Sequence, residues 1–154
     1  MGWEDSHLHM FEIEGKRCEI PYDGGLGPEP DSHDESGHKL KDVLSSGMEF
    51  SYLYDFGDDW THRIIVEDQG DAEEGKQVPA CIAGERACPP EDSGGPFGYP
   101  EFLDALSDPD HPEHEDIVDW AGEFDPAAFN IAQANNLIGA ICAIYRERGM
   151  GFGG

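Results

Sequence analysis

Basic residues are scarce in this sequence of 154 residues. Lys and Arg together number nine, against 34 Asp and Glu, and the formal net charge is −25 at pH 7. Proteins bind nucleic acid largely by placing Lys and Arg against phosphates, and basic segments attract anionic membranes in the same way. Direct binding to DNA, RNA or a membrane surface is therefore disfavoured. The acidity fits a solvated shell suited to high salt, an unknown protein partner that is itself basic, or a bound cation.

Long apolar runs are missing as well. No stretch approaches the roughly 20 apolar residues that cross a bilayer. The N-terminus, Met1-Gly2-Trp3, has neither the basic nor the apolar region of a secretory signal. We therefore expect a cytoplasmic protein, in which the few cysteines are free thiols rather than two disulfides. These cysteines are Cys18, Cys81, Cys88 and Cys142.

Apolar and aromatic residues are nevertheless abundant enough for a folded core, at 38% and 10% of the chain. Residues 7–14 alternate as a strand does. The clearest element is a hairpin, in which residues 50–56 alternate strictly between aromatic and other side chains and residues 61–67 return after a Gly-Asp turn. The aromatic positions are Phe50, Tyr52, Tyr54 and Phe56.

The second half of the chain favours helices. We expect a short helix around residues 102–106, a second from Pro112, and a long one that begins at Asp125-Pro126, where Asp suits the N-cap and Pro the first helical position. Residues 21–38 and 68–76 are expected to be loops, and residues 84–100 a rigid Gly- and Pro-containing loop. These elements predict an α+β fold: an antiparallel sheet with an aromatic-rich central hairpin, packed by C-terminal helices.

Two long motifs carry a family resemblance, namely residues 50–62 and residues 81–92, the latter followed by Gly94-Gly95 and Gly98-Tyr99. Together with residues 3–9 and 124–126 they make the chain resemble the plasmid pRiA4b ORF-3-like family over about residues 1–137. The resemblance implies an α+β fold in proteins found on chromosomes and on mobile elements. It implies no established biochemical activity. The resolvase label of some relatives does not suit this chain, which lacks an Arg-rich centre.

The same resemblance implies a domain organisation. Residues 1–149 would form a single domain of this family, followed by a frayed tail at residues 150–154. Relatives usually begin earlier, with a strand and a helix ahead of the Gly2-Trp3 pair. We therefore expect this chain to lack those two elements. Either its start codon is misassigned, which is our hypothesis, or the chain is a shortened variant with an exposed sheet edge.

Three groups of residues could hold a metal ion or carry acid–base chemistry. His7 and His9 stand two apart on one strand face, a spacing that lets both imidazoles reach one ion. The second group surrounds the hairpin turn, and the third lies on the rigid loop. Carboxylates with imidazoles suit a divalent metal such as zinc, manganese or iron, and an open coordination position could activate water. The second group is Asp55, Asp58, Asp59 and His62; the third is Cys81, Cys88, Glu91 and Asp92.

A structural role explains the same residues. Asp and Gly are what a tight turn requires, and Glu91 and Asp92 could cap backbone amides. The aromatic stripe is expected in the core, although Tyr52 and Tyr54, if exposed beside Trp60, would form a protein-interaction patch. No Ser-His-Asp order, nucleophile elbow or nucleotide fingerprint is present. The sequence thus favours a protein-interaction or regulatory module, with a metal-dependent hydrolase using His and Asp ligands as the alternative.

Overall fold

The computed structural model of the chain describes residues 2–21, 31–71 and 79–147. The chain divides into two compact units. The first, which we call the sheet unit, consists of residues 5–70 and 92–102. The second, the helical unit, consists of residues 1–4, 71–91 and 103–154. The sequence predicted one domain over residues 1–149, and the structure divides the chain into these two units.

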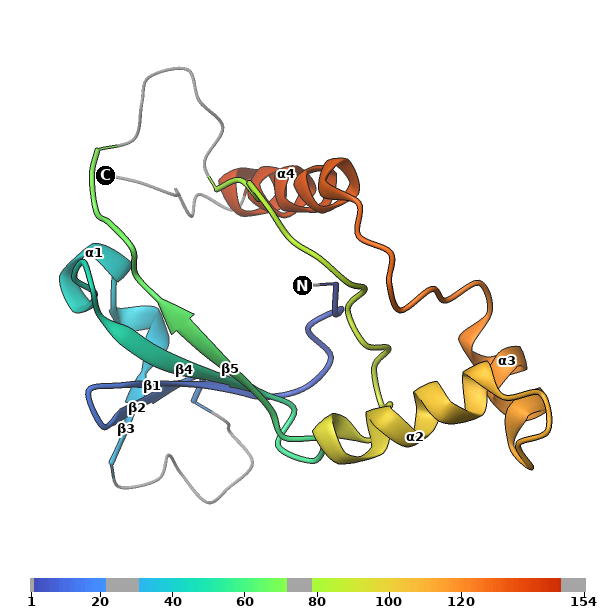
Figure 1. The fold of residues 1–154 in the computed structure, drawn as a ribbon. Helices are drawn as coiled ribbons and strands as arrows, with labels where there is room; N and C mark the ends of the chain where they lie inside the picture. The colour runs from blue at the N-terminus through green and yellow to red at the C-terminus, as the bar shows by residue number, and fades with distance from the viewer. Residues whose placement is uncertain (1, 22–30, 72–78, 148–154) are drawn as a thin grey trace. The chain divides into compact units, whose positions relative to one another are not determined.

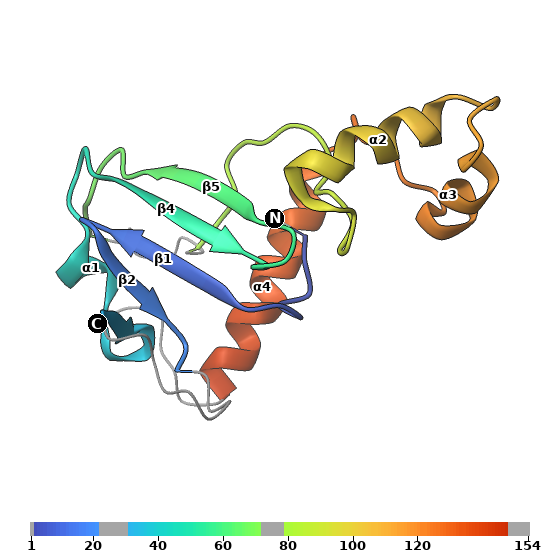
Figure 2. The same ribbon diagram turned by 90° about the horizontal axis from the view of Figure 1, so that it is seen from below.

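The sheet unit is built on a five-stranded sheet in the order β3-β2-β1-β4-β5 (Figures 1 and 2). Neighbouring strands are antiparallel, except that β3 runs parallel to β2. The α+β class is therefore confirmed, with a sheet that is mixed at one edge. The strands are β1 (His9–Ile13), β2 (Lys16–Glu19), β3 (Ser32–Asp34), β4 (Glu49–Tyr54) and β5 (Trp60–Ile65).

Local sequence explains both hairpins. β1 and β2 are joined by Glu14 and Gly15, which both have positive φ, at 52° and 74°, as a two-residue type I′ turn requires. β4 and β5 are joined by a longer turn that begins and ends at residues with positive φ, Asp55 at 56° and Asp59 at 59°. Asp tolerates this conformation better than most residues, so the Asp-rich sequence of the turn has a conformational reason.

The aromatic alternation of the hairpin is confirmed as one face of the sheet. Phe11, Tyr52 and His62 are directly opposite one another on β1, β4 and β5. The rings of Phe11 and Tyr52 are 4.9 Å apart, and those of Tyr52 and His62 are 5.6 Å apart. Phe50 and Tyr54 are buried on this face, whereas Phe56 lies in the turn beyond the end of β4 and is 49% exposed. The alternation thus ends with the strand at Tyr54, two residues before the predicted fourth aromatic position.

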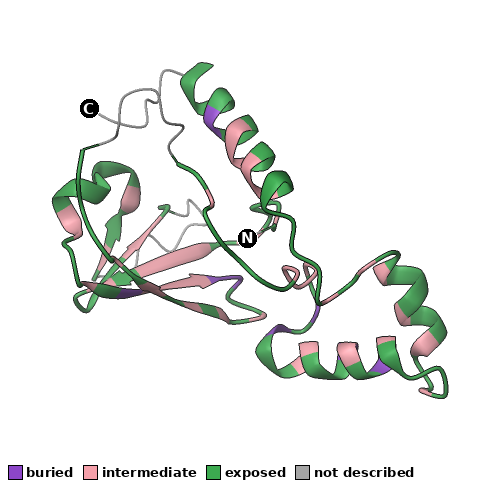
Figure 3. Cartoon of the chain, turned by 45° about the horizontal axis from the view of Figure 1, so that its top comes forward, coloured by how far each residue is buried: buried purple, intermediate pink, exposed green. Residues whose placement is uncertain are grey.

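Four helices and one 3₁₀ turn complete the described chain (Figure 1). Coloured by burial, α3 shows only exposed and intermediate residues, while α2 and α4 each carry buried positions (Figure 3). None of the helices in the described ranges combines the length and the apolar character that a membrane crossing needs. The elements are η1 (Glu35–Gly37), α1 (Leu40–Val43), α2 (Gly95–Ser107), α3 (His114–Ala121) and α4 (Ile131–Glu147).

Three expectations about elements were wrong. The segment expected to be a loop at residues 21–38 contains β3 and η1, because cross-strand pairing with β2 overrides its polar composition. Helix α2 begins at Gly95, not near residue 102, with Pro96 in the first turn, where its missing N–H costs nothing. Helix α4 begins at Ile131, because Asp125 caps only a short turn and Asn130 accepts a hydrogen bond from Gln133 N. The predicted tail, residues 150–154, lies outside the described residues.

The helical unit is held by contacts between distant segments. The Asn135 side chain of α4 accepts a hydrogen bond from Cys81 N at 2.8 Å and donates to Cys81 O at 2.9 Å. The indole of Trp3 donates to Pro89 O at 2.8 Å. The ring of Phe129 lies so close to Gly84 that a β-carbon at residue 84 would overlap with it. The extended segment at residues 79–91 is therefore fixed by side chains rather than by a strand ladder.

Candidate functional site

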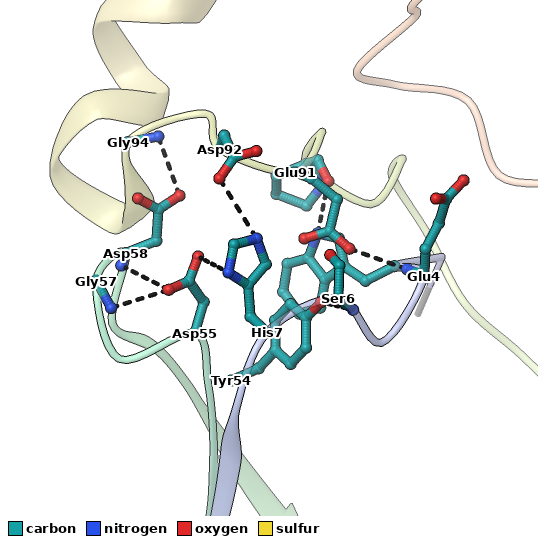
Figure 4. Close-up of polar contacts among 12 residues, drawn as sticks. Glu4, Ser6, His7, Tyr54, Asp55, Gly57, Asp58, Glu91, Asp92 and Gly94 are labelled. Atoms are coloured by element: carbon teal, nitrogen blue, oxygen red, sulfur yellow. Dashed lines mark hydrogen bonds and ion pairs between the residues drawn. The ribbon is translucent and has the colours of Figure 1, made fainter. Parts of the chain in front are cut away.

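Three segments of the sheet unit meet at the hairpin end of the sheet (Figure 4). They are the residues just before β1, the turn between β4 and β5, and the residues just before α2. Each contributes one side chain to a group whose potential ligand atoms all lie within 4.8 Å of one another. We call this group the His7 cluster; it consists of His7, Asp55 and Asp92.

Asp55 is the buried member of the His7 cluster, with 8% of the residue exposed. Its backbone N donates to Leu8 O at 2.9 Å, which ties the start of the turn to the segment before β1. Its Oδ1 accepts from Gly57 N at 2.8 Å and from Asp58 N at 3.3 Å. One oxygen of the carboxylate therefore shapes the turn, and Oδ2 faces the cluster.

The imidazole of His7 stands between the two carboxylates (Figure 4). Its Nδ1 is 3.4 Å from Asp55 Oδ2, and its Nε2 is 3.3 Å from Asp92 Oδ1. Its ring also meets the ring of Tyr54 edge-on, with centroids 5.9 Å apart. The side chain of Asp92 is 74% exposed, so the cluster opens to solvent on that side.

A second contact holds the segment before α2 against the turn. Asp58 Oδ2 accepts a hydrogen bond from Gly94 N at 3.1 Å. The next residue, Gly95, has φ of 66° and lies directly against Asp58 O. The segment that carries Asp92 is thus fixed by its contacts with Asp58. Asp58 holds this segment in place and is not itself a member of the His7 cluster.

The arrangement of His7 calls for a positive species beside it. A neutral imidazole has one N–H and one lone pair, so it can donate to only one of the two carboxylates. The lone pair of the other nitrogen then faces a carboxylate oxygen, an unfavourable pairing unless a proton or a metal ion lies between them. Two ligand atoms about 2.1 Å from a tetrahedral ion are roughly 3.4 Å apart, which is close to the separation of either carboxylate from the ring nitrogen that faces it. Because the two ring nitrogens point away from each other, one ion takes one nitrogen, and the carboxylate on the other side of the ring has to turn toward that ion. The cluster can therefore hold a cation.

The two histidines predicted to share one ion have separate partners. His9 lies with its Nε2 3.1 Å and 3.2 Å from the two carboxylate oxygens of Glu35, and its Nδ1 is 3.7 Å from Asp5. The spacing of His7 and His9 does not bring them together, because His7 precedes the strand, where the period of two no longer holds. Nothing in the sequence singled out Glu35, which is 26 residues away from His9.

The remaining predicted ligands lie elsewhere. The Nδ1 of His62 is 3.1 Å from Tyr52 O on β4, not at the turn. Cys81, Cys88 and Glu91 belong to the helical unit, whereas Asp92 belongs to the sheet unit. Glu91 accepts a hydrogen bond from Glu4 N at 2.9 Å, and burial raises the pKa of the Cys88 thiol. Within the described ranges, Cys81, Cys88 and Glu91 are not members of the group of donor atoms that could share an ion.

The predicted aromatic patch is not an exposed surface. Tyr54 is only 2% exposed, and its hydroxyl accepts from Ser6 N at 3.2 Å. Tyr52 is half-buried, and burial, followed by the nearby carboxylates of Asp5 and Glu35, raises its pKa to about 12. Trp60 packs edge-on against Tyr99 of α2, with ring centroids 5.9 Å apart. These side chains therefore pack within the sheet unit.

A small cavity of about 220 Å³ lies at another part of the sheet unit, beside β2, β3 and α1. Cys18, His33 and His38 are among its lining residues, and no member of the His7 cluster is. The donor atoms of these three residues do not meet the closeness that the cluster shows within the described ranges. The cavity is therefore a separate feature from the candidate cation site.

Known proteins resemble this chain in sequence and in structure. An uncharacterised protein of Sinorhizobium fredii, y4hQ, is 38% identical over 152 residues, which cover 96% of this chain and 76% of that protein. A crystal structure of a protein of unknown function from Methanosarcina mazei Go1 is 39% identical and superposes with a TM-score of 0.74, covering 85% of this chain and 74% of the other. Neither name records an activity, so the metal-dependent hydrolase gains no support from these relatives.

The family model described as plasmid pRiA4b ORF-3-like protein matches residues 1–133, which include both central motifs and all three members of the His7 cluster. The chain therefore belongs to the plasmid pRiA4b ORF-3-like family.

Proposed function

We propose that this protein is a regulatory module that binds a divalent cation through His7, Asp55 and Asp92. The observation that carries the proposal is the convergence of their donor atoms, within 4.8 Å of one another, from three separate segments of the sheet unit. One imidazole and two carboxylates suit Zn²⁺, Mn²⁺ or Fe²⁺ better than they suit Cu⁺, which prefers sulfur. The two carboxylates balance the charge of a divalent ion when His7 is neutral.

Regulation follows from where the three ligands lie. A cation bound to all three would tie together the segment before β1, the hairpin turn and the segment before α2. The cation would add a further link between this segment and the other two, beside the hydrogen bond from Gly94 N to Asp58 Oδ2. A ligand that binds one arrangement of these segments more tightly than another shifts the equilibrium between them by its difference in affinity for the two states. The proposal needs no chemical step at the metal.

The test compares two charge-identical variants. Asp92→Asn removes a proposed ligand, while Asp59→Asn removes an exposed carboxylate on the neighbouring turn that lies outside the His7 cluster. Both residues have similar positive φ, at 56° and 59°, and Asn tolerates this conformation. Chelator-treated protein would be titrated with Zn²⁺, Mn²⁺ and, under anaerobic conditions, Fe²⁺, by calorimetry and by thermal unfolding.

We expect stoichiometric binding of at least one of these ions to the wild type and to Asp59→Asn. At 100-fold excess over Kd the ion would stabilise the fold by about 2.7 kcal/mol, a rise of roughly 5–10 °C in Tm for a chain of this size. Asp92→Asn should weaken binding by at least the roughly tenfold to hundredfold that loss of a partner behind a ligand costs, and His7→Gln likewise. Equal binding by the wild type and Asp92→Asn, or no binding to folded wild type, would overturn the proposal.

A further inference from the structure

The two edges of the sheet differ in how they are protected against pairing with another strand. One edge is β3, which has only three residues, all of them polar. The other edge is β5, which has six residues, contains neither Lys nor Pro, and ends in two isoleucines (Figure 2). Its register with β4 is continuous, without a bulge. Short length, Lys, Pro and bulges are the usual protections of an edge strand, and β5 has none of them.

The backbone of β5 offers hydrogen-bonding groups at this edge. Val66 N donates to Met48 O at 2.8 Å, so the backbone of Val66 faces β4. Alternate residues of an antiparallel strand turn their N–H and C=O to the same neighbour. Arg63 and Ile65 therefore turn theirs away from β4, toward the open side of the sheet. Among the described residues, these backbone groups have no hydrogen-bond partner.

The sequence of this edge is complementary to itself when it is reversed. It reads Arg63-Ile64-Ile65-Val66-Glu67. If two copies pair antiparallel about Ile65, the two Ile65 side chains are opposite each other, and each Arg63 is opposite Glu67 of the other copy. Each Ile64 is then opposite Val66 of the other copy. Opposite charges and β-branched pairs are the favourable cross-strand neighbours, so this register has a favourable pair at every position.

The side chains that this register uses are accessible. Ile65 is 51% exposed, the Arg63 side chain is 68% exposed, and Glu67 is exposed. Within its own chain, Arg63 donates from Nε and Nη2 to the two carboxylate oxygens of Glu49, at 2.6 Å and 2.5 Å. A guanidinium has five N–H donors, so Nη1 remains to donate to a second carboxylate.

We propose that two copies of the chain pair antiparallel along β5, with the two-fold axis at Ile65, so that their sheets join into one. The self-complementary sequence selects this occupant, because a two-fold interface requires each copy to supply both halves of every contact. The net charge of −25 on each copy opposes association, and two strand edges form a small interface. We therefore expect a weak dimer. The inference does not depend on cation binding by His7.

Sedimentation equilibrium of the full chain tests this pairing. The protein would be examined with a chelator present, from about 1 µM to about 1 mM, since small interfaces give weak association. The buffer would contain about 0.15 M NaCl, where the Debye length is about 8 Å and repulsion between distant carboxylates is screened. We expect a monomer–dimer equilibrium for the wild type. Glu67→Arg should raise the Kd of the dimer by about tenfold or more, because both ion pairs become pairs of like charge.

Asp31→Arg is the matched control variant. Asp31 is exposed and directly precedes β3, at the opposite edge of the same sheet. Like Glu67→Arg, it replaces one negative charge by one positive charge, so both variants reduce the repulsion between copies equally. Asp31→Arg should dimerise at least as well as the wild type. Net charge alone would make Glu67→Arg do the same, whereas pairing along β5 makes Glu67→Arg weaker.

A mixture of two variants tests the register itself. Arg63→Glu alone should also fail to dimerise, since Glu would then be opposite Glu67 of the other copy. Mixed with Glu67→Arg, it should form a heterodimer, because one copy carries Glu at positions 63 and 67 and the other carries Arg at both. Circular dichroism would confirm that each variant is folded. Recovery of association in the mixture would show that the separate losses were not losses of folding.

Three results would overturn the proposal. The first is a wild type that stays monomeric over the whole concentration range. The second is equal association of Glu67→Arg and Asp31→Arg, which would place any dimer on another surface. The third is the absence of a heterodimer from the two folded variants. The behaviour of Asp92→Asn toward Zn²⁺ or Mn²⁺ leaves these results unchanged, so the cation site and the dimer can each fail without the other.

Discussion

Gly95 lies against the carbonyl oxygen of Asp58 with no room for a side chain between them, and a β-carbon built at residue 95 would overlap that oxygen. The two residues are 37 positions apart, and their contact sets the first turn of α2 on the hairpin turn. Gly95 also has φ of 66°, a conformation that glycine adopts without steric cost. This contact, with the Asp58–Gly94 hydrogen bond beside it, fixes the segment that presents Asp92.

Replacing this glycine should therefore be costly. We expect Gly95→Ala to lower the free energy of unfolding by about 2–4 kcal/mol, since it adds a clash with backbone to an unfavourable φ. Urea unfolding followed by circular dichroism would measure it. Gly37→Ala is the control, because that glycine has no atom within 4 Å of a built β-carbon and no positive φ. A Gly95→Ala midpoint equal to that of Gly37→Ala would show that the contact is not tight in solution.

Asn135 offers a second stability test, in the helical unit. Its side chain bonds to both the N–H and the C=O of Cys81, so Asn135→Ala would leave two partly buried backbone groups without this partner. We expect a loss of about 1–3 kcal/mol. The neighbouring Asn136→Ala, at an exposed position of the same helix, should unfold within about 0.5 kcal/mol of the wild type. Chemical unfolding of both variants and of the wild type would measure these differences in the free energy of unfolding.

The hydroxyl of Tyr52 should ionise at an unusually high pH. Burial is the main reason that its pKa is raised to about 12 from the usual 10. Absorbance at 295 nm, recorded for the wild type and for Tyr52→Phe, isolates its ionisation by difference. We expect a midpoint near pH 12 while the protein stays folded. A midpoint near 10 would mean that Tyr52 is solvated.

The same shift links Tyr52 to stability. The folded pKa lies above the unfolded pKa, so folding favours the neutral hydroxyl. Its contribution is fully present below about pH 10 and is lost as the pH rises through about 12. Tyr52→Phe should therefore lose less stability than the wild type between pH 9 and pH 12, because Phe has no hydroxyl to ionise. Urea midpoints of both proteins at intervals across this range would measure the difference.

Cys88 should react slowly with alkylating reagents. Burial is the first cause of the raised pKa of its thiol, and the thiolate is the reacting form. In a variant that keeps only Cys88, the rate of reaction with iodoacetamide should rise with pH at a higher midpoint than for a cysteine in an unstructured peptide. A midpoint at or below the peptide value would contradict the burial of the thiol.

Local sequence predicted the parts of the fold that depend on neighbours along the chain. The alternation of Phe50, Tyr52 and Tyr54 determined the central strand and its inward face, because side chains in a strand alternate sides with a period of two. The Gly-Asp turn and the placement of helices in the second half followed from similar local signals. The motifs at residues 50–62 and 81–92 also determined the family, because a long specific run of residues identifies relatives without any structure.

Tertiary structure decided which of the candidate ligands meet. His7 and His9, close in sequence, go to different carboxylates, whereas His7, Asp55 and Asp92 come from three separate segments. The sequence named all three residues but grouped them wrongly, because sequence spacing fixes side-chain proximity only within one regular element. The sequence likewise did not predict the exposure of Phe97 or the contact of Gly95 with Asp58, since both result from how α2 packs on the hairpin. Composition determined the net charge of the protein, whereas packing determined which two carboxylates lie beside His7.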